Sequence, residues 1–239
     1  MTKTIKGSVV VITGASGAIA QALIAELTAR GAAKIYTAAR DISGLAASGY
    51  LMPIKMDVTS DDDVAKAAAI ATDVTLLINN AGVNHNTGFM VAPDLAVARE
   101  EIEANYLGPL RVTRAFAPAL IANGGAVLNI LSILARVNLP FIGSYCASKA
   151  AGLSLTQGLR GELGPKGVRV VAAMPGAVDT RMTAMLTIPK MATVAAATEI
   201  LDGFEAGEEE IYVGEMARGI AQGLAHDPKA IERQLASPG

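Results

Sequence analysis

Tyr145 and Lys149 stand four residues apart in a segment of helical composition, and Ser132 ends the preceding predicted strand. Residues at positions i and i+4 share one helix face, with Cβ atoms about 6 Å apart. Tyrosine has an unperturbed pKa of about 10, and lowering it to about 7 takes about 4 kcal/mol. An ammonium group about 4 Å away supplies about that much at an effective dielectric of about 20. The pattern therefore predicts a tyrosine that passes a proton to or from a substrate oxygen.

Each part of this group also has a simpler interpretation. Chance often places a tyrosine four residues before a lysine in a helix, and a serine at a strand end commonly makes only local hydrogen bonds. The assignment therefore depends on whether a cofactor site precedes these residues in the chain.

A glycine-rich turn, Thr13-Gly14-Ala15-Ser16-Gly17-Ala18-Ile19-Ala20, follows the first predicted strand and opens a helix. Such a turn brings backbone N–H groups and a helix N-terminus close to a pyrophosphate. Small residues are needed because side chains would hold the phosphates away. An ordinary tight strand-to-helix turn has a similar composition, so this motif alone leaves both interpretations open.

The second predicted strand ends in Ala38-Ala39-Arg40, about twenty residues beyond the turn. Enzymes that prefer NAD usually have an acidic residue there to bind the ribose hydroxyls. Arg40 would instead pair with a 2′-phosphate, which predicts NADP(H) as the preferred cofactor, with NAD(H) possible. The alternative is a solvated arginine at a strand end.

Two further strand ends carry residues suited to a dinucleotide. Asp57-Val58 closes the third strand, where a carboxylate can accept a hydrogen bond from the adenine amino group. Asn79-Asn80-Ala81-Gly82 closes the fourth, and its small residues leave room for a cofactor across the sheet edge, where open α/β sheets bind ligands.

Short β-branched runs alternate with alanine-rich amphipathic stretches along the chain. Predicted strands are Val9–Ile12, Ile35–Thr37, Met52–Met56, Val74–Ile78, Ala126–Leu131, Val168–Ala173 and Glu210–Val213. Predicted helices are Ala18–Arg30, Ser60–Ala71, Leu95–Ala104, Leu107–Ala122 and Ser144–Leu163, with Ser60 and Asp94 as N-caps and Gly31 as a C-terminal stop. This order predicts an α/β, Rossmann-like, doubly wound parallel sheet of about seven strands with helices on both faces.

Composition favours a single soluble domain over residues 1–239, with a charged helical extension at 214–239. The net charge of −2 suggests no electrostatic binding of nucleic acid or of an acidic membrane. Polar residues and a proline interrupt the uncharged stretch between Arg114 and Arg136, so we expect helix, turn and strand there rather than a membrane span. Cys146 is the only cysteine, which excludes an intramolecular disulfide and favours a reducing, cytoplasmic location. His85 and His226 do not suggest a metal site.

Over essentially its whole length the chain resembles the short-chain dehydrogenase/reductase family. The turn at Thr13-Gly14, Asn79-Asn80-Ala81-Gly82, Asn105, Ser132, Tyr145-Cys146-Ala147-Ser148-Lys149 and Pro175-Gly176-Ala177-Val178-Asp179-Thr180 match its motifs in order and spacing.

The resemblance implies a role for each candidate catalytic residue. Tyr145 would be the general acid in reduction and the base in oxidation, and Ser132 would hydrogen-bond the substrate oxygen. Lys149 would hold the nicotinamide ribose and lower the pKa of Tyr145. Asn105 would keep a water that links Lys149 to solvent.

The resemblance also implies the cofactor contacts. Thr180 and the backbone after Pro175 would hold the nicotinamide carboxamide. Together with Tyr145 and Lys149, the candidate cofactor-binding residues are Gly14, Ser16, Gly17, Ala18, Ile19, Arg40, Asp57, Val58, Asn80, Ala81, Gly82, Pro175, Gly176, Val178 and Thr180.

Two residues depart from the family pattern, because Ala18 and Ala20 stand where glycine is usual. The position of Ala20 mainly permits close helix–strand packing, so a methyl group there is a mild change. The methyl group of Ala18 would lie near the phosphates. No basic residue stands in the turn, so the predicted NADP(H) preference depends on Arg40.

Apolar residues near the predicted site suggest an adaptable substrate pocket. The candidates, with Ser132 and Tyr145, are Leu134, Asn138, Phe141, Met182, Met185 and Leu186. The last three fall in the short segment Met182–Met191, where the family has a mobile lid. The alternative is that these side chains belong to the core or to an oligomer interface.

The leading hypothesis is an NADP(H)-dependent carbonyl reductase or alcohol dehydrogenase that acts on a small molecule. A non-catalytic, dinucleotide-binding regulatory protein is the alternative. An enoyl reductase is disfavoured, because those enzymes place the tyrosine further from the lysine. The family also implies a homotetramer or homodimer built on Leu107–Ala122 and Ser144–Leu163.

Overall fold

The computed structural model describes residues 4–236 and contains one parallel seven-stranded sheet in the order β3-β2-β1-β4-β5-β6-β7. The predicted sheet is therefore confirmed, and each predicted strand overlaps an observed one. The strands are β1 Val9–Thr13, β2 Lys34–Ala39, β3 Leu51–Lys55, β4 Leu76–Asn79, β5 Ala126–Ile130, β6 Arg169–Pro175 and β7 Glu210–Val213.

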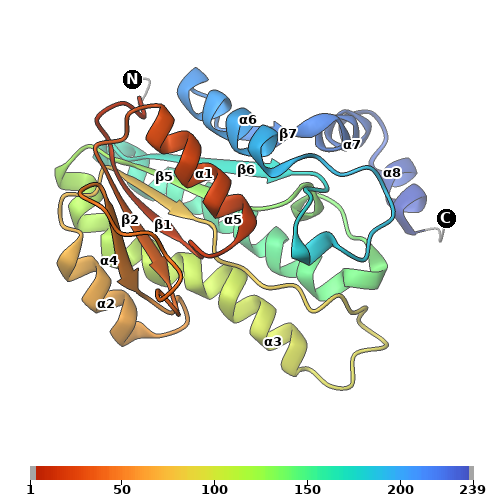
Figure 1. Ribbon diagram of the computed structural model, residues 1–239. Helices are drawn as coiled ribbons and strands as arrows, with labels where there is room; N and C mark the ends of the chain where they lie inside the picture. The colour runs from red at the N-terminus through yellow and green to blue at the C-terminus, as the bar shows by residue number, and fades with distance from the viewer. Residues whose placement is uncertain (1–3, 237–239) are drawn as a thin grey trace.

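Helices cover both faces of the sheet (Figure 1). On one face, α1 (Ala18–Ala29) and α6 (Thr193–Ala206) pack on apolar side chains such as Val10, Ile12 and Leu128. On the other face, α2 (Asp61–Ile70), α4 (Gly108–Ala122) and α5 (Gly143–Leu163) enclose side chains such as Val11, Leu77 and Val127. Alternate strand residues thus enter opposite cores, which explains why these strands are apolar on both faces.

Two of the predicted helix ends are observed as expected. The Ser60 side chain accepts a hydrogen bond from the backbone N–H of Asp63 at the start of α2. Gly31 has φ of 80° just beyond α1, a conformation that favours glycine. At α3 (Ala96–Ile102), Leu95 occupies the N-cap position, while Asp94 Oδ1 accepts from the backbone N–H of Ala96 at 2.6 Å.

Two features differ from the sequence prediction, the presence of α6 and the end of α3. Helix α6 was not predicted, although its buried Ala196, Ala197, Ile200, Leu201 and Phe204 follow a helical period. Instead of continuing to residue 104, α3 passes at Glu103 into a π-helical turn, Glu103–Leu107. The predicted C-terminal extension contains α7 (Gly214–His226) and α8 (Pro228–Ala236), and residues 237–239 of it lie outside the described part. Within residues 4–236, no helix combines the length and apolar composition needed to cross a membrane.

Candidate active site

The predicted site residues gather at the carboxyl edge of the sheet, because all strands are parallel and end on the same side. The predicted residues that follow or end successive strands are Gly14, Arg40, Asp57, Asn80, Ser132 and Pro175. The fold therefore brings together groups that lie far apart in the sequence.

The glycine-rich turn is locked against the end of β4. The hydroxyl of Thr13 accepts hydrogen bonds from the backbone N–H groups of Asn80 and Ala81, both at 3.0 Å. Asn80 Nδ2 also donates to Thr13 O at 3.0 Å. Gly14 has φ of 65°, and a Cβ there would lie 2.8 Å from the Cα of Ala81. This close approach to the backbone at the end of β4 explains why position 14 requires glycine.

Helix α1 begins without a capping side chain, because its N-cap is Gly17. The N–H groups of Ala18, Ile19 and Ala20 precede the first intrahelical bond, which Gln21 makes to Gly17 O at 2.9 Å. Gly17 and Ala18 are exposed, whereas Ala20 is fully buried beneath them. An uncapped helix start beside Gly14 is a suitable place for phosphate groups, so the turn fits a dinucleotide. The methyl group of Ala20 points into the core, and that of Ala18 lies at the surface.

Arg40 and Asp57 lie close enough at the ends of β2 and β3 to interact electrostatically. Burial opposes ionisation of Asp57, but hydrogen bonds from Thr59 and the charges of Arg40 and Arg111 outweigh it and lower the pKa of this carboxyl. Arg111 also donates to the carbonyl oxygen of Val58 at 2.8 Å. Arg40 is exposed at this rim, as a residue that binds a phosphate from solvent would be.

Ser132, Tyr145 and Lys149 meet as a largely buried group, with exposed fractions of 8%, 8% and 6%. The predicted i, i+4 spacing of Tyr145 and Lys149 falls within α5. Lys149 Nζ lies 5.7 Å from the centre of the Tyr145 ring and donates a hydrogen bond to Ile130 O at 3.1 Å. The carbonyl at the end of β5 thus orients the ammonium group beside the phenol.

Burial shifts the pKa values of both groups. It lowers the pKa of Lys149 to about 8. It raises the pKa of the Tyr145 phenol, and a hydrogen bond with the Ser132 side chain only partly opposes this rise. The sequence led us to expect a lowered Tyr145 pKa, so the direction differs from that expectation. The reason is that burial removes the hydration of the phenolate, an effect that residue spacing alone does not show.

Asn105 lies in the π-helical turn and connects two elements of the site. Its side chain exchanges two 2.8 Å hydrogen bonds with the backbone of Val83 and donates a third, also 2.8 Å, to the Ser148 hydroxyl. A Cβ at Gly82 would lie 2.8 Å from Asn105 Oδ1 and 3.6 Å from Lys149 Nζ. Gly82 therefore gives Asn105 and Lys149 the space to approach the end of β4.

We expect Gly82→Ala to lower stability by about 1–3 kcal/mol, because the added methyl group must displace the buried Asn105 side chain. Denaturant unfolding would measure this loss. The control is Gly219→Ala in α7, where a Cβ meets nothing within 4 Å. That substitution should stabilise the helix by about 0.5–1 kcal/mol. Equal stability of Gly82→Ala and wild type would contradict the expected crowding.

The segment after β6 closes on itself beside the site. Val178 forms an isolated parallel bridge with Met191, so residues 181–190 form a loop whose two ends are joined. The Thr180 and Thr183 side chains approach to 3.4 Å, and Thr183 also accepts from the Thr180 N–H. Gly176 packs under α7, since a Cβ there would lie 3.0 Å from Met216. Helix α7 thus helps to place the predicted carboxamide-binding backbone.

The predicted substrate residues occupy different surroundings. Leu134 packs against the cluster of Ile142, Tyr145 and Cys146, and Asn138 Nδ2 donates to Gly143 O at 3.2 Å. Phe141, Met182 and Met185 are exposed by 50%, 37% and 63%, and Leu186 is half-buried.

Phe89 is a further residue near the site that was not predicted from the sequence. A Cβ on Gly143, the first residue of α5, would lie only 2.5 Å from the Phe89 ring. Phe89 thus borders the first turn of the helix that carries Tyr145. The signal available in the sequence was the apolar group Phe89-Met90-Val91 within a polar loop.

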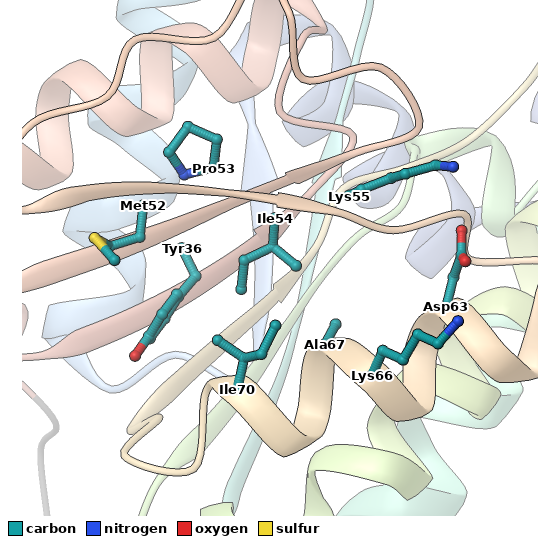
Figure 2. Close-up of a pocket in the computed structure, with 9 residues that line it drawn as sticks. All are labelled: Tyr36, Met52, Pro53, Ile54, Lys55, Asp63, Lys66, Ala67 and Ile70. Atoms are coloured by element: carbon teal, nitrogen blue, oxygen red, sulfur yellow. The ribbon is translucent and has the colours of Figure 1, made fainter.

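A separate hollow of about 370 Å³ lies between β3 and α2, and no predicted site residue lines it (Figure 2). Apolar side chains such as Ile54 and Ile70 form its walls, and Lys55 and Lys66 lie at one end. Because it lies at the outer edge of the sheet, this hollow does not contribute to the candidate site.

Comparison with known proteins agrees with this geometry. A model of the short chain dehydrogenase family matches residues 8–190. A short chain dehydrogenase from Burkholderia cenocepacia J2315, solved in complex with NADP, is 45% identical with a TM-score of 0.96 and covers 99% of this chain and 100% of that one. The chain therefore belongs to the short-chain dehydrogenase/reductase family of oxidoreductases.

Two curated relatives are longer than the chain. The short-chain dehydrogenase ptmH of Penicillium ochrochloron is 36% identical over 182 residues, which are 72% of this chain and 66% of that protein. An NADPH-dependent 1-acyldihydroxyacetone phosphate reductase of Schizosaccharomyces pombe is 33% identical over 181 residues. These are 72% of this chain and 60% of that protein. The match spans less than two thirds of either protein.

Proposed function

We propose that the protein is an NADP(H)-dependent oxidoreductase that interconverts a carbonyl compound and an alcohol, with Tyr145 as the proton donor and acceptor. The main support is the buried group of Ser132, Tyr145 and Lys149, which shares the carboxyl edge of the sheet with an uncapped helix start. Membership of the short-chain dehydrogenase/reductase family supports the same reaction class.

Different residues of the chain would bind the cofactor and transfer the proton. The first turn of α1 and Gly14 would bind the pyrophosphate, and Lys149 would hold the nicotinamide ribose. When bound, the nicotinamide ring supplies or accepts the hydride. Tyr145 Oη–H would donate its proton to the carbonyl oxygen during reduction, and Oη would take it back during oxidation. Ser132 Oγ would donate a hydrogen bond to the same oxygen.

The charges of these groups at neutral pH favour reduction. With a pKa of about 8, Lys149 is mainly an ammonium at pH 7. The raised pKa of Tyr145 keeps the phenol protonated, as a proton donor requires. Oxidation would need the phenol to ionise, and both the Lys149 ammonium and the Ser132 hydroxyl favour that ionisation at close range.

Arg40 is the expected determinant of NADP(H) preference. Its exposed guanidinium at the end of β2 can pair with a 2′-phosphate, and two similar proteins are described as NADP-bound or NADPH-dependent. We expect Arg40→Asp to weaken NADPH binding about 100-fold and to strengthen NADH binding, because the charge pair becomes a repulsion.

Fluorescence titration with both cofactors would measure these affinities. Arg114→Asp makes the same charge change at an exposed arginine within α4 rather than at the end of β2. Unchanged NADPH affinity in Arg40→Asp would remove this role.

A substrate panel tests the proposed reaction directly. The exposed Phe141, Met182 and Met185 support apolar ketones and aldehydes as substrates. NADPH oxidation would be followed with such compounds and, separately, with an enoyl thioester. Turnover of carbonyl compounds supports the proposal. Cofactor binding without turnover would instead support a dinucleotide-binding regulatory protein.

A further inference from the structure

Two parallel sets of hydrogen bonds connect the loop after β4 to α5. In the first, Asn105 joins the backbone of Val83 to the hydroxyl of Ser148. In the second, Glu101 accepts from the backbone N–H of His85 at 2.8 Å and from the hydroxyl of Ser144 at 2.5 Å. We call these sets the Asn105 link and the Glu101 link.

The two links repeat one pattern along three segments. Val83 and His85 are two residues apart in the loop, whereas Glu101 and Asn105 are four apart, as are Ser144 and Ser148. The Asn105 link thus holds the residue just before Lys149. The Glu101 link holds the residue just before Tyr145. Each proton-transfer residue therefore has one hydrogen-bonded link beside it.

Glu101 differs from Asn105 because it is acidic and almost completely buried, with 1% of its surface exposed. Burying a carboxylate is costly unless donors satisfy it. Its two hydrogen-bond partners within residues 4–236 are neutral, and both of its oxygens accept. The 2.5 Å bond from Ser144 lies in the range of charge-assisted O–H···O⁻ bonds. Both side-chain oxygens of Glu101 therefore have donors, one from the loop after β4 and one from the first turn of α5.

We propose that Glu101 is a positioning residue for proton transfer, which ties the loop after β4 to the first turn of α5, the helix turn that carries Tyr145. This inference rests on the proposed function of Tyr145. Burial is the main cause of the raised pKa values of Tyr145 and Cys146, and the nearby Glu101 carboxylate raises both further.

Other charged groups around the link could affect a pH profile. Lys149 and Cys146 lie near Tyr145 on α5. Arg99, Glu100 and Glu103 flank Glu101 along the chain, and the His85 ring pairs with Glu100 at 3.0 Å. Glu100 is a suitable matched control, because its side chain is 63% exposed and interacts with the ring of His85 rather than with its backbone.

Glu101→Gln separates charge from position. The amide oxygen can accept from the His85 N–H, and the NH₂ group can donate to the Ser144 oxygen, so the link persists without its charge. Loss of a nearby negative charge lowers the pKa of Tyr145. The rise of kcat/KM with pH during alcohol oxidation should therefore move to lower pH, by on the order of half a pH unit. Glu100→Gln should leave the profile in place.

Ser144→Ala tests the hydrogen-bonded link without changing the charge. It removes one hydrogen bond from the link but keeps the charge, so kcat should fall several-fold while the pH profile stays in place or moves to higher pH. Hydrogen–deuterium exchange should also become faster in the first turn of α5. This second readout requires neither substrate nor cofactor.

The outcomes distinguish the two proposals. A Glu101→Gln profile that superimposes on wild type would overturn the effect of charge. Wild-type kcat and exchange in Ser144→Ala would overturn the positioning role. Should Glu101→Gln not fold, Ser144→Ala decides the positioning role. If wild type turns over no substrate, the proposed function fails, and the exchange measurements alone decide whether Glu101 ties the loop to α5.

Discussion

Replacing Tyr145 with Phe is expected to lower kcat by about 10³-fold, because a positioned proton donor typically contributes about 10²–10⁴-fold. The substitution removes only the hydroxyl. The ring stays packed against Ile142, Cys146 and the partly buried Leu134, so KM and stability should change little. A fall in kcat with little change in KM would mean that the lost interaction acts in the transition state.

Tyr36→Phe is the matched control. Tyr36 is also buried and also hydrogen-bonded through its hydroxyl, to Asp73 at 2.9 Å, but it lies on β2 beside the hollow of Figure 2. It should keep wild-type kcat. Steady-state rates with the best carbonyl substrate would compare the variants. A Tyr145→Phe enzyme within about tenfold of wild type would exclude the proposed role, because one acid–base group contributes at least about 100-fold.

Replacing Lys149 with Met is expected to lower activity by at least about 100-fold and to make the protein more stable at pH 7. Activity falls because the ammonium group beside the phenol is lost. Stability rises because burial disfavours the charged lysine, whose pKa falls from 10.5 to about 8. This fall in pKa corresponds to about 3 kcal/mol. The hydrogen bond lost at Ile130 O offsets about 1 kcal/mol, so we expect a net gain of about 1–2 kcal/mol.

The pH dependence of this gain follows from the direction of the shift. Below about pH 8 lysine is charged in both the folded and the unfolded chain, so the folded protein carries the full penalty. Between about pH 8 and 10.5 the unfolded chain binds more protons, so wild-type stability rises with pH. The advantage of Lys149→Met should therefore shrink over that interval.

Denaturant unfolding of wild type and Lys149→Met at several pH values would test this. Lys66→Met changes an exposed lysine on α2 and serves as the control, with little expected effect on stability. If Lys149→Met is less stable than wild type at pH 7, burial of the charged lysine does not lower the free energy of unfolding.

The sequence alone determined the features that depend on local spacing. The i, i+4 placement of Tyr145 and Lys149 is set by helical periodicity, and the two-faced apolar strands predict a parallel sheet. Since parallel strands end on one side, the positions of Gly14, Arg40 and Ser132 at one edge followed from that sheet. Helix α6 could also have been predicted, because Ala196, Ile200 and Phe204 repeat every four residues.

Only the tertiary structure decided what depends on contacts between distant segments. Glu101 occurs among charged residues and reads as part of a solvated helix face, yet packing of α3 against α5 buries it beside Ser144. The close approach of Gly82 to Asn105, and the rise rather than the fall of the Tyr145 pKa, depend likewise on which groups share one buried volume. Spacing along the chain determines which side chains share a face, whereas hydration and distance between segments are determined only when the chain folds.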